Sequence, residues 1–223
     1  METKINEIFS SIQGEGPVVG YKQLFIRFCG CNLNCSYCDT EFKNGISYTP
    51  QELFNKISTE YQLDTFHSIS LTGGEPLVSV GFLKEFLPLI KGKTKIYLET
   101  NATMHDELEQ IKNYLDIISA DIKLESSSNL KTLDLHKKFF EKCSGIYTFA
   151  KIVFDSNITE NEILECSNIG KSFDIELVLQ PKMNIDGSIS ISSDFCNEIL
   201  DKFTKNYQNV RLIPQVHKFI DVR

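Results

Sequence analysis

The sequence predicts an α/β fold, a partial, open-sided (βα)6-type parallel barrel with its helices on the outside. Short apolar runs alternate with amphipathic segments along the whole chain, which is typical of a parallel sheet with helical crossovers. The chain has 223 residues, whereas a complete eight-unit barrel typically needs about 250. An open doubly wound sheet is the alternative closure, and both closures place the chemistry at the carboxyl ends of the strands.

The expected elements follow one another as strand and then helix. Thr49-Pro50 begins the first helix, because proline is favoured at the first helical position and Leu53 and Ile57 recur at helical spacing. A Gly-Gly turn separates the second strand from the next helix. Strands are expected at residues 23–29, 68–71, 95–99, 116–120, 147–154, 175–180 and 210–213, and helices from residue 50 onward and at 80–90, 105–114, 131–143, 159–169 and 193–203.

Composition narrows the classes of function. The formal net charge of −7 argues against a general nucleic-acid-binding protein, which would carry a basic patch. No apolar run approaches the roughly 18 residues that a membrane span needs, and the polar, acidic N-terminal residues are unlike a signal peptide. We therefore expect one cytoplasmic domain over residues 1–223, trimmed at residues 205–223, with no direct binding of nucleic acid or membrane.

Clustered cysteines give the strongest chemical signal. Cys31, Cys35 and Cys38 form the pattern C-x3-C-x2-C directly after a predicted strand. Three thiolates on one loop, residues 29–40, can hold a [4Fe–4S] cluster, which normally has four cysteine ligands. Because the pattern supplies only three cysteines, the fourth iron is open to a chelating ligand. A structural zinc site is the alternative, although it requires four closed ligands.

The remaining cysteines are expected to pack rather than to bind metal. Cys29 lies two residues before Cys31 and shares its face of the strand. The other three are scattered through segments with helical patterning, where free cysteine behaves as a small buried hydrophobe. They are Cys143, Cys166 and Cys196.

Two further features lie next to predicted strand ends. Gly73-Gly74-Glu75 follows the second strand, where glycines let the backbone approach a ligand and Glu75 offers an acceptor for an ammonium group. An ordinary turn is the alternative. Arg27 lies within an apolar strand, and a buried guanidinium is costly unless it is paired. We expect Arg27 to face a carboxylate or a polar pocket; a solvent-facing position is the alternative.

These motifs together resemble a known superfamily. C-x3-C-x2-C, with Tyr37 before its last cysteine and Gly73-Gly74-Glu75-Pro76 after the second strand, resembles the radical S-adenosylmethionine (SAM) superfamily. Within it, residues 8–16 (IFSSIQGEG), Cys38-Asp39-Thr40 and residues 211–218 (RLIPQVHK) resemble the 7-carboxy-7-deazaguanine synthase family. The resemblance covers nearly the whole chain.

The resemblance implies roles for individual residues. It implies a [4Fe–4S] cluster on the three cysteines and Mg²⁺ at Thr40, completed by substrate oxygens and waters; Thr40 as a helix N-cap is the alternative. The segment 98–101, at the end of the third strand, is also consistent with cofactor contacts. Implied SAM contacts are Tyr37, Cys38, Asp39, Gly73, Gly74, Glu75, Asp121, Ile122, Lys123 and Gln180. Implied substrate contacts are Ile12, Gln13, Gly14, Glu15, Arg27, Thr72, Gln215 and His217.

The same resemblance implies the activity. It is the conversion of 6-carboxy-5,6,7,8-tetrahydropterin to 7-carboxy-7-deazaguanine with loss of ammonia, a step of queuosine and deazapurine biosynthesis. A one-electron donor, flavodoxin or ferredoxin, and a homodimeric assembly are implied as well. The alternative is an activating enzyme that generates a glycyl radical on a partner protein with the same cluster and SAM. A non-catalytic zinc module is a third reading, which a colourless preparation would favour.

Overall fold

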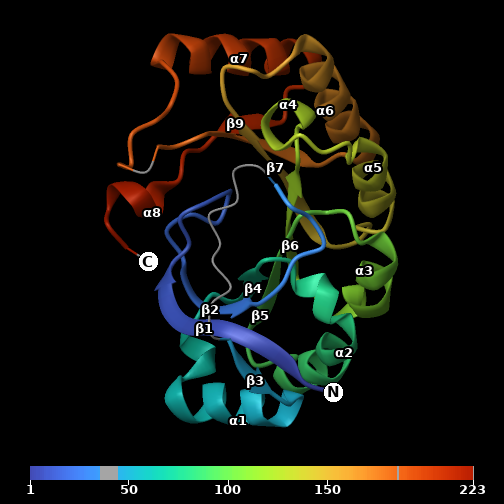
Figure 1. Cartoon of the computed structure of the whole chain (residues 1–223), viewed down its shortest axis with the longest axis vertical. Helices are drawn as coiled ribbons and strands as arrows, with labels where there is room; N and C mark the ends of the chain where they lie inside the picture. The colour runs from blue at the N-terminus through green and yellow to red at the C-terminus, as the bar shows by residue number, and fades with distance from the viewer. Residues whose placement is uncertain (36–44, 185, 223) are drawn as a thin grey trace.

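All strands of the computed structural model, which describes residues 1–35, 45–184 and 186–222, belong to one sheet. Their order is β3-β1-β2-β4-β5-β6-β7-β8-β9 (Figure 1). From β2 onward the neighbours run parallel, whereas β1 is antiparallel to both β2 and β3. The bounds are β1 Thr3–Ile12, β2 Lys22–Phe28, β3 Ile46–Tyr48, β4 Ser68–Gly73, β5 Lys95–Thr100, β6 Ile117–Ile122, β7 Tyr147–Phe154, β8 Glu176–Pro181 and β9 Val210–Leu212.

Each connection between consecutive parallel strands carries a helix, as the sequence predicts. The crossover helices are α1 Pro50–Glu60, α2 Val80–Ile90, α3 His105–Ile111, α4 Glu125–Ser128 with α5 Leu133–Glu141, α6 Glu160–Phe173 and α7 Ser193–Asn206, and α8 Val216–Phe219 follows β9. Short 3-10 turns lie at η1 Leu63–Thr65, η2 Pro76–Ser79 and η3 Lys112–Tyr114. The described residues therefore form six crossovers, in agreement with the expected (βα)6-type class.

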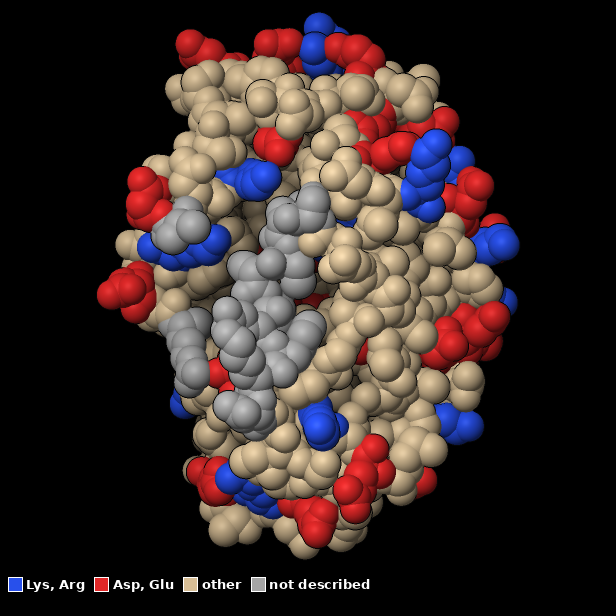
Figure 2. All heavy atoms as spheres, viewed as in Figure 1, with Lys and Arg blue, Asp and Glu red and all other residues tan. Residues whose placement is uncertain are grey.

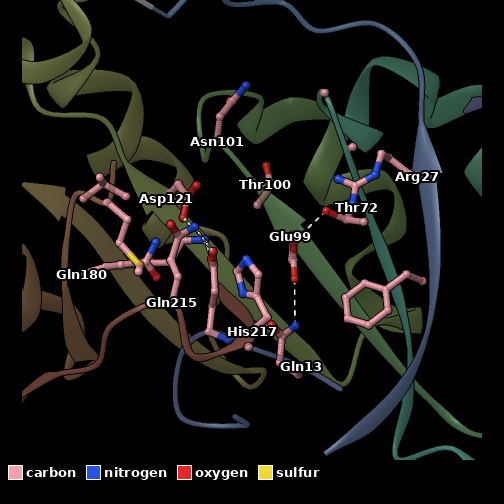
Figure 3. A pocket seen from close by; sticks show the side chains of 18 of the residues that line it. Gln13, Arg27, Thr72, Glu99, Thr100, Asn101, Asp121, Gln180, Gln215 and His217 are labelled. Carbon is pink, nitrogen blue, oxygen red and sulfur yellow. Dashed lines mark hydrogen bonds and ion pairs between the residues drawn. The ribbon is translucent and has the colours of Figure 1, made fainter. Parts of the chain in front are cut away.

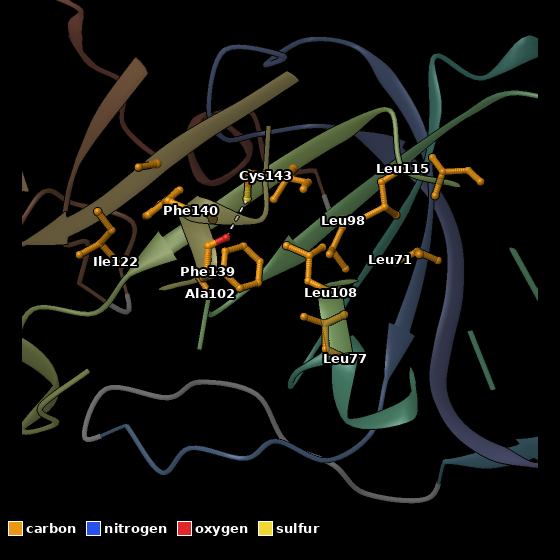
Figure 4. Packing of buried hydrophobic residues seen from close by; sticks show 14 of the residues in the cluster. Leu71, Leu77, Leu98, Ala102, Leu108, Leu115, Ile122, Phe139, Phe140 and Cys143 are labelled. Atoms are coloured by element: carbon orange, nitrogen blue, oxygen red, sulfur yellow. Dashed lines mark hydrogen bonds between the residues drawn. The ribbon is translucent and has the colours of Figure 1, made fainter. Parts of the chain in front are cut away.

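The crossover helices pack on a single face of the sheet. Along β2, Leu24 and Ile26 point into the helix-covered core, whereas Phe25 and Arg27 point to the opposite face. One continuous cluster joins that strand face to the crossover helices α1, α2, α3, α5, α6 and α7, for example through Leu53, Phe82, Leu108, Phe139, Ile163 and Phe203 (Figures 1 and 4). A doubly wound sheet has helices on both faces. The predicted open-sided fold with helices outside is therefore confirmed, and the other face remains available for a ligand site.

The strands β1 and β3 were not predicted from the sequence, for a physical reason in each case. β1 contains a bulge between Ile5 and Glu7, which shifts its register on β2. A bulge breaks the strict alternation of apolar residues by which a strand is recognised. Ile5 consequently faces the helix-covered core, whereas Phe9 stacks on Phe25. β3 has only three residues and gives no periodic signal.

Local sequence explains where the helices begin. Thr49 caps α1 by accepting a hydrogen bond from the Glu52 amide, and Glu52 in turn accepts from the Thr49 amide. Thr159 and Glu162 form the same reciprocal capping box at α6. Such boxes satisfy two of the amide donors that a helix leaves unpaired at its start. The Thr49-Pro50 start of α1 is thus confirmed.

Charged side chains of both signs are mixed over the surface. On the described part of the face seen in Figure 2, Lys and Arg alternate with Asp and Glu, and no continuous basic stripe forms. This pattern agrees with the formal net charge of −7. Among the described residues, no helix has the length and apolar character needed to cross a bilayer.

Candidate active site

A polar cavity lies on the face of the sheet that the crossover helices leave free. Its volume is about 970 Å³, near the upper end of the range for small-molecule sites. Residues from the carboxyl ends of β2 and β4 to β8 line it, together with the loop after β1 and the segment after β9 (Figure 3). Of the residues predicted as ligands, Ile12, Gln13, Gly14, Glu15, Arg27, Cys31, Cys35, Thr72, Gly73, Gly74, Asp121, Lys123, Gln180, Gln215 and His217 line this cavity.

The cysteine loop reaches the cavity mouth. Cys31 is exposed, Cys35 is half-buried, and both line the cavity. The Cys31 sulfur accepts hydrogen bonds from the Leu33 amide at 3.4 Å and from Asn101 Nδ2 at 3.7 Å. The predicted ligands Tyr37, Cys38, Asp39 and Thr40 lie outside the described residues. Among those described, no group of three or more His, Cys, Asp or Glu residues forms a metal-binding cluster.

The other cysteines lie away from this mouth. Cys29 does not line the cavity; its sulfur lies where a Cβ on Gly45 would collide with it, at 2.4 Å. Burial raises the pKa of the Cys29 thiol. The three scattered cysteines are buried in the hydrophobic core, as expected, and are Cys143, Cys166 and Cys196.

The glycine turn after β4 brings backbone to the cavity. Gly73 has φ +123°, and a Cβ there would lie 2.2 Å from the Phe28 carbonyl oxygen, so only glycine fits. The Gly74 amide donates to the same oxygen at 3.2 Å. The turn thus lies against the end of β2, next to the start of the cysteine loop, and its backbone is accessible to a ligand.

Glu75 supports this turn from behind and does not line the cavity; its predicted contact with SAM stays a prediction. Its carboxylate is fully buried and accepts from the backbone N–H of Asn101 at 2.7 Å, the backbone N–H of Leu77 at 3.0 Å and Thr100 Oγ1. Burial raises the pKa of Glu75 to about 7, against the opposing effect of these donors. An acceptor with three partners in the protein is a structural anchor.

Glu99 is the central carboxylate of the cavity floor; the sequence indicated it only as part of segment 98–101, with no role of its own. Its Oε1 accepts from Gln13 Nε2 at 2.9 Å, and its Oε2 accepts from Thr72 Oγ1 at 2.6 Å (Figure 3). Gln13 Nε2 also donates to Gln23 Oε1 at 2.9 Å. Glu99 therefore joins two residues predicted to contact the substrate, one from the loop after β1 and one from β4.

A buried ion network closes another side of the cavity. Lys151 of β7 pairs with Glu15 and lies 3.2 Å from Asp121 Oδ1, and Lys123 lies 3.0 Å from Asp121 Oδ2. Burial alone would raise the pKa of Glu15, but the Lys151 ammonium and the Gln215 amide outweigh it and lower that pKa to about 2. Burial likewise disfavours charge on Lys151, yet Asp121 and Glu15 hold its pKa well above the ordinary value.

Lys151 was missed because its strand, 147–154, was assigned only a structural role. The signal was present: a lysine in an apolar strand carries the same desolvation cost that drew attention to Arg27. Arg27 itself donates from Nε to Glu7 Oε1 at 2.6 Å, and its guanidinium lies 5.7 Å from the Phe9 ring centre. It is half-buried on the cavity wall, so the expected carboxylate partner is present.

The C-terminal segment lies over the loop that follows β1. Gln215 Nε2 donates to Glu15 Oε1 at 2.6 Å, and the Val216 amide donates to the Gly14 carbonyl at 2.9 Å. His217 packs so closely on Gly14 that an added Cβ would lie 2.2 Å from its Nδ1. Two segments far apart in the sequence thus meet at the cavity and form part of its wall.

The end of β6 divides its residues between two faces. Asp121 and Lys123 line the cavity, whereas the Ile122 side chain lies in the hydrophobic core. The predicted contact of Ile122 with SAM stays a prediction, and because strand alternation turns the side chain into the core it would involve the backbone. Gln180, at the end of β8, is buried beside the cavity, and its Oε1 has no hydrogen-bond partner within the described part of the chain.

The site fits an iron–sulfur cluster with a second bound cofactor. Cys31 and Cys35 present sulfur at the mouth. The Cys31 sulfur accepts from two N–H groups, those of the Leu33 backbone and the Asn101 side chain, which suits a thiolate ligand. Beside them, the glycine turn supplies open backbone, and the unpartnered Gln180 oxygen offers an acceptor. A parallel sheet with such a loop at its carboxyl edge defines a radical SAM protein.

Comparisons with known proteins agree with this class. The radical SAM superfamily matches residues 25–152. A 7-carboxy-7-deazaguanine synthase from Geobacter sulfurreducens is 36% identical over 97% of this chain and 96% of the relative. One from Archaeoglobus fulgidus is 34% identical over the full length of both. The chain belongs to the 7-carboxy-7-deazaguanine synthase family, and membership of the superfamily implies a [4Fe–4S] cluster and SAM.

Solved structures share the fold at lower identity. QueE from Escherichia coli is 20% identical, with a TM-score of 0.68 over 97% of this chain and 95% of that one. A radical SAM methyltransferase from Sphaerobacter thermophilus is 12% identical, with a TM-score of 0.64 over 87% of this chain. These solved structures therefore share the fold of this chain.

Proposed function

We propose that this chain converts 6-carboxy-5,6,7,8-tetrahydropterin to 7-carboxy-7-deazaguanine with loss of ammonia. The observation that carries the proposal is full-length similarity to proteins named 7-carboxy-7-deazaguanine synthase. The cavity supports it, because its volume of about 970 Å³ suits two small ligands side by side. None of the relatives reported above favours the activating-enzyme alternative.

Cys31, Cys35 and Cys38 would hold the cluster. The chemistry that such a cluster supplies together with SAM is one-electron cleavage of the cofactor to methionine and a carbon radical. Gly73 and Gly74 would contact SAM through their backbone. The side chains of Asp121, Lys123 and Gln180 would do so from neighbouring strand ends, together with residues 37–39. The unpartnered Gln180 oxygen supports this assignment, since a buried acceptor requires a donor.

The pterin would lie against the floor and the C-terminal segment. Arg27 would meet the substrate carboxylate, because guanidinium groups bind carboxylates in a fixed, planar geometry. Ile12 to Glu15, Thr72, Gln215 and His217 would surround the ring. The buried ion network around Lys151 fixes Glu15 before the substrate binds, and the overlying C-terminal segment reduces the access of water to the radical.

Mg²⁺ is proposed at Thr40 as part of a ternary site. Mg²⁺ favours six oxygen ligands and usually retains waters and substrate oxygens, so one threonine hydroxyl is sufficient only if the substrate carboxylate contributes. The metal would neutralise and position that carboxylate. Removal of Mg²⁺ should therefore raise the KM for the pterin while leaving the iron content unchanged.

The remaining elements of the proposal concern the surroundings of the enzyme. We propose one domain over residues 1–223, a homodimer, an electron donor of the flavodoxin or ferredoxin type, and a cytoplasmic location. A reducing compartment is consistent with free, clustered cysteines.

One experiment tests the reaction. The protein is reconstituted anaerobically with iron and sulfide, and reductant, SAM, Mg²⁺ and the carboxy-tetrahydropterin are added. 7-Carboxy-7-deazaguanine should accumulate, and a Cys35→Ser variant should form none. Cleavage of SAM without this product would overturn the substrate assignment and leave the radical SAM class in place. A colourless preparation that binds no iron would overturn both.

A further inference from the structure

A closed ring of side-chain hydrogen bonds lies directly behind Cys31. Asn32 Nδ2 donates to Thr103 Oγ1 at 2.9 Å, and Thr103 Oγ1 donates to Asn101 Oδ1 at 2.6 Å. Asn101 Nδ2 completes the ring by donating to Asn32 Oδ1 at 2.8 Å. Asn101 and Thr103 are each 6% exposed, whereas Asn32 is exposed. The buried part of the ring is well ordered because each of its members is satisfied.

The orientation of the Asn101 amide follows from this ring. The Thr103 backbone N–H donates to Asn101 Oδ1 at 3.2 Å, and a backbone N–H has no other role than donor. The oxygen of the amide must therefore face Thr103, and its nitrogen must face Cys31 and Asn32. Asn101 Nδ2 accordingly points an N–H at the Cys31 sulfur, 3.7 Å away.

Asn101 is held in place from below as well. Its own backbone N–H donates to the buried Glu75 carboxylate at 2.7 Å, and the Glu75 N–H donates to the Gly30 carbonyl at 2.9 Å. Gly30 immediately precedes Cys31. The glycine turn, the end of β5 and the start of the cysteine loop are thus joined through one residue, so the position of Asn101 relative to Cys31 is fixed by three elements.

We propose that Asn101 is a positioning residue for the cluster: it holds Cys31 for ligation and donates an N–H···S hydrogen bond to its sulfur. This inference rests on the proposed function, since it assumes that Cys31 is a cluster ligand. Hydrogen bonds to cluster sulfurs stabilise the more negative, reduced state and set the reduction potential of an iron–sulfur cluster. The second donor on this sulfur, the Leu33 amide, lies on the loop itself.

The test compares variants of the reconstituted protein that differ in this one donor. Asn101→Leu keeps the size of the side chain and removes the donor, and Asn101→Asp places a carboxylate beside the sulfur. Iron and sulfide per chain are measured first, and the midpoint potential of the cluster is then measured by electron paramagnetic resonance during a redox titration. The potential should shift to more negative values in Asn101→Leu and further in Asn101→Asp, and a chelator should remove iron several-fold faster.

Two controls separate the sulfur contact from the ring. Thr103→Val removes one hydroxyl of the ring but keeps the Thr103 N–H that orients Asn101, so its potential should stay close to that of the wild type. Asn113→Leu makes the same substitution at an exposed position and should change nothing. Unfolding of the iron-free proteins shows whether each variant folds; if Asn101→Leu does not, the comparison of Asn101→Asp with Thr103→Val decides.

The outcomes are distinct. Wild-type potential in Asn101→Leu or Asn101→Asp, at full iron content, would overturn the inference. Equal shifts in Thr103→Val and Asn101→Leu would also overturn it, because they would assign the effect to the ring as a whole. Absence of a cluster in the wild-type protein would instead overturn the proposed function.

Discussion

Single residues decide which cysteines can act as ligands. Cys31 and Cys29 are two positions apart, yet one lies at the cavity mouth and the other packs under residue 45. We therefore expect Cys31→Ser to lose its iron and its brown colour after anaerobic reconstitution, whereas Cys29→Ser retains both. Iron analysis and the visible absorption spectrum measure this difference. Equal loss in the two variants would contradict the assignment of Cys29 to packing.

Glu99 allows a prediction about the cavity floor. In Glu99→Gln the new amide oxygen can accept from Gln13, and the new NH2 must donate to the Thr72 hydroxyl, so two charge-assisted hydrogen bonds are replaced by neutral ones. The expected cost is about 1–2 kcal/mol of unfolding free energy, because hydrogen bonds to charged groups contribute more than neutral ones. Denaturant unfolding of the iron-free protein measures it. Glu141→Gln, at an exposed position on α5, is the matched control and should leave the stability unchanged.

The residue scale also shows what the sequence could and could not predict. Residues 12–15 and Thr72 were found because they belong to recognisable motifs, and the cavity gathers them. The burial of Glu75 could not be predicted, because its partners Thr100 and Asn101 lie at and just after the end of another strand, β5. The same holds for Lys151, whose two carboxylate partners lie far from it along the chain.

At the scale of elements, helix starts follow from local sequence and allow a direct test. Removing the Thr159 hydroxyl with Thr159→Ala breaks the capping box of α6 and should cost about 1 kcal/mol of unfolding free energy. The substitution Thr204→Ala, near the end of α7, removes only a hydroxyl bonded to its own helix and is the control. A similar loss of stability in both variants would contradict the role of the cap.

His136 connects three elements and makes stability depend on pH. Its Nδ1 lies 3.0 Å from the Ala102 carbonyl after β5, and its Nε2 accepts from the Lys123 amide after β6 at 3.0 Å. This pattern requires the neutral ring, with the proton on Nδ1. Burial lowers the pKa of His136 to about 4, against the effect of the Ala102 hydrogen bond. The unfolded chain, with an ordinary histidine pKa of about 6.5, binds the proton more readily.

The sign of the effect follows from this difference. The contribution of His136 is complete above about pH 6.5 and is lost as the pH falls toward 4, by at most about 3 kcal/mol. Glu75, whose pKa burial raises to about 7, acts in the opposite direction over part of this range. The test therefore compares two iron-free proteins, the wild type and His136→Asn, by their unfolding free energies at pH 7 and pH 5. The wild type should lose more unfolding free energy between these two pH values than His136→Asn does. Identical profiles would contradict the role of His136.

At the scale of the whole molecule, the parallel sheet with its helical crossovers was predictable because it depends on repeated local patterns. Six apolar runs followed by amphipathic segments require a parallel sheet, and the helix-facing residues of each strand alternate with polar ones such as Thr72, Glu99 and Asp121. The antiparallel strand β1 was missed because its bulge disrupts that alternation. The contact between residues 13–16 and the C-terminal segment was beyond prediction, since no local signal records it.

That contact supports a last prediction, about how the two ends of the molecule complete the cavity. Gly14→Ala would place a methyl group 2.2 Å from His217 Nδ1, so the C-terminal segment must move outward. We expect a higher KM for the pterin, with iron content unchanged because the cysteines lie at another side of the cavity. His217→Gly in the same chain removes both the ring and the Cβ, which the new methyl group would otherwise meet at 2.5 Å, so the double variant should bind the pterin no worse than His217→Gly alone. Gly81→Ala, which meets only the flexible Met1 side chain, is the control. If Gly14→Ala leaves the KM unchanged, the C-terminal segment is not a wall of the substrate site.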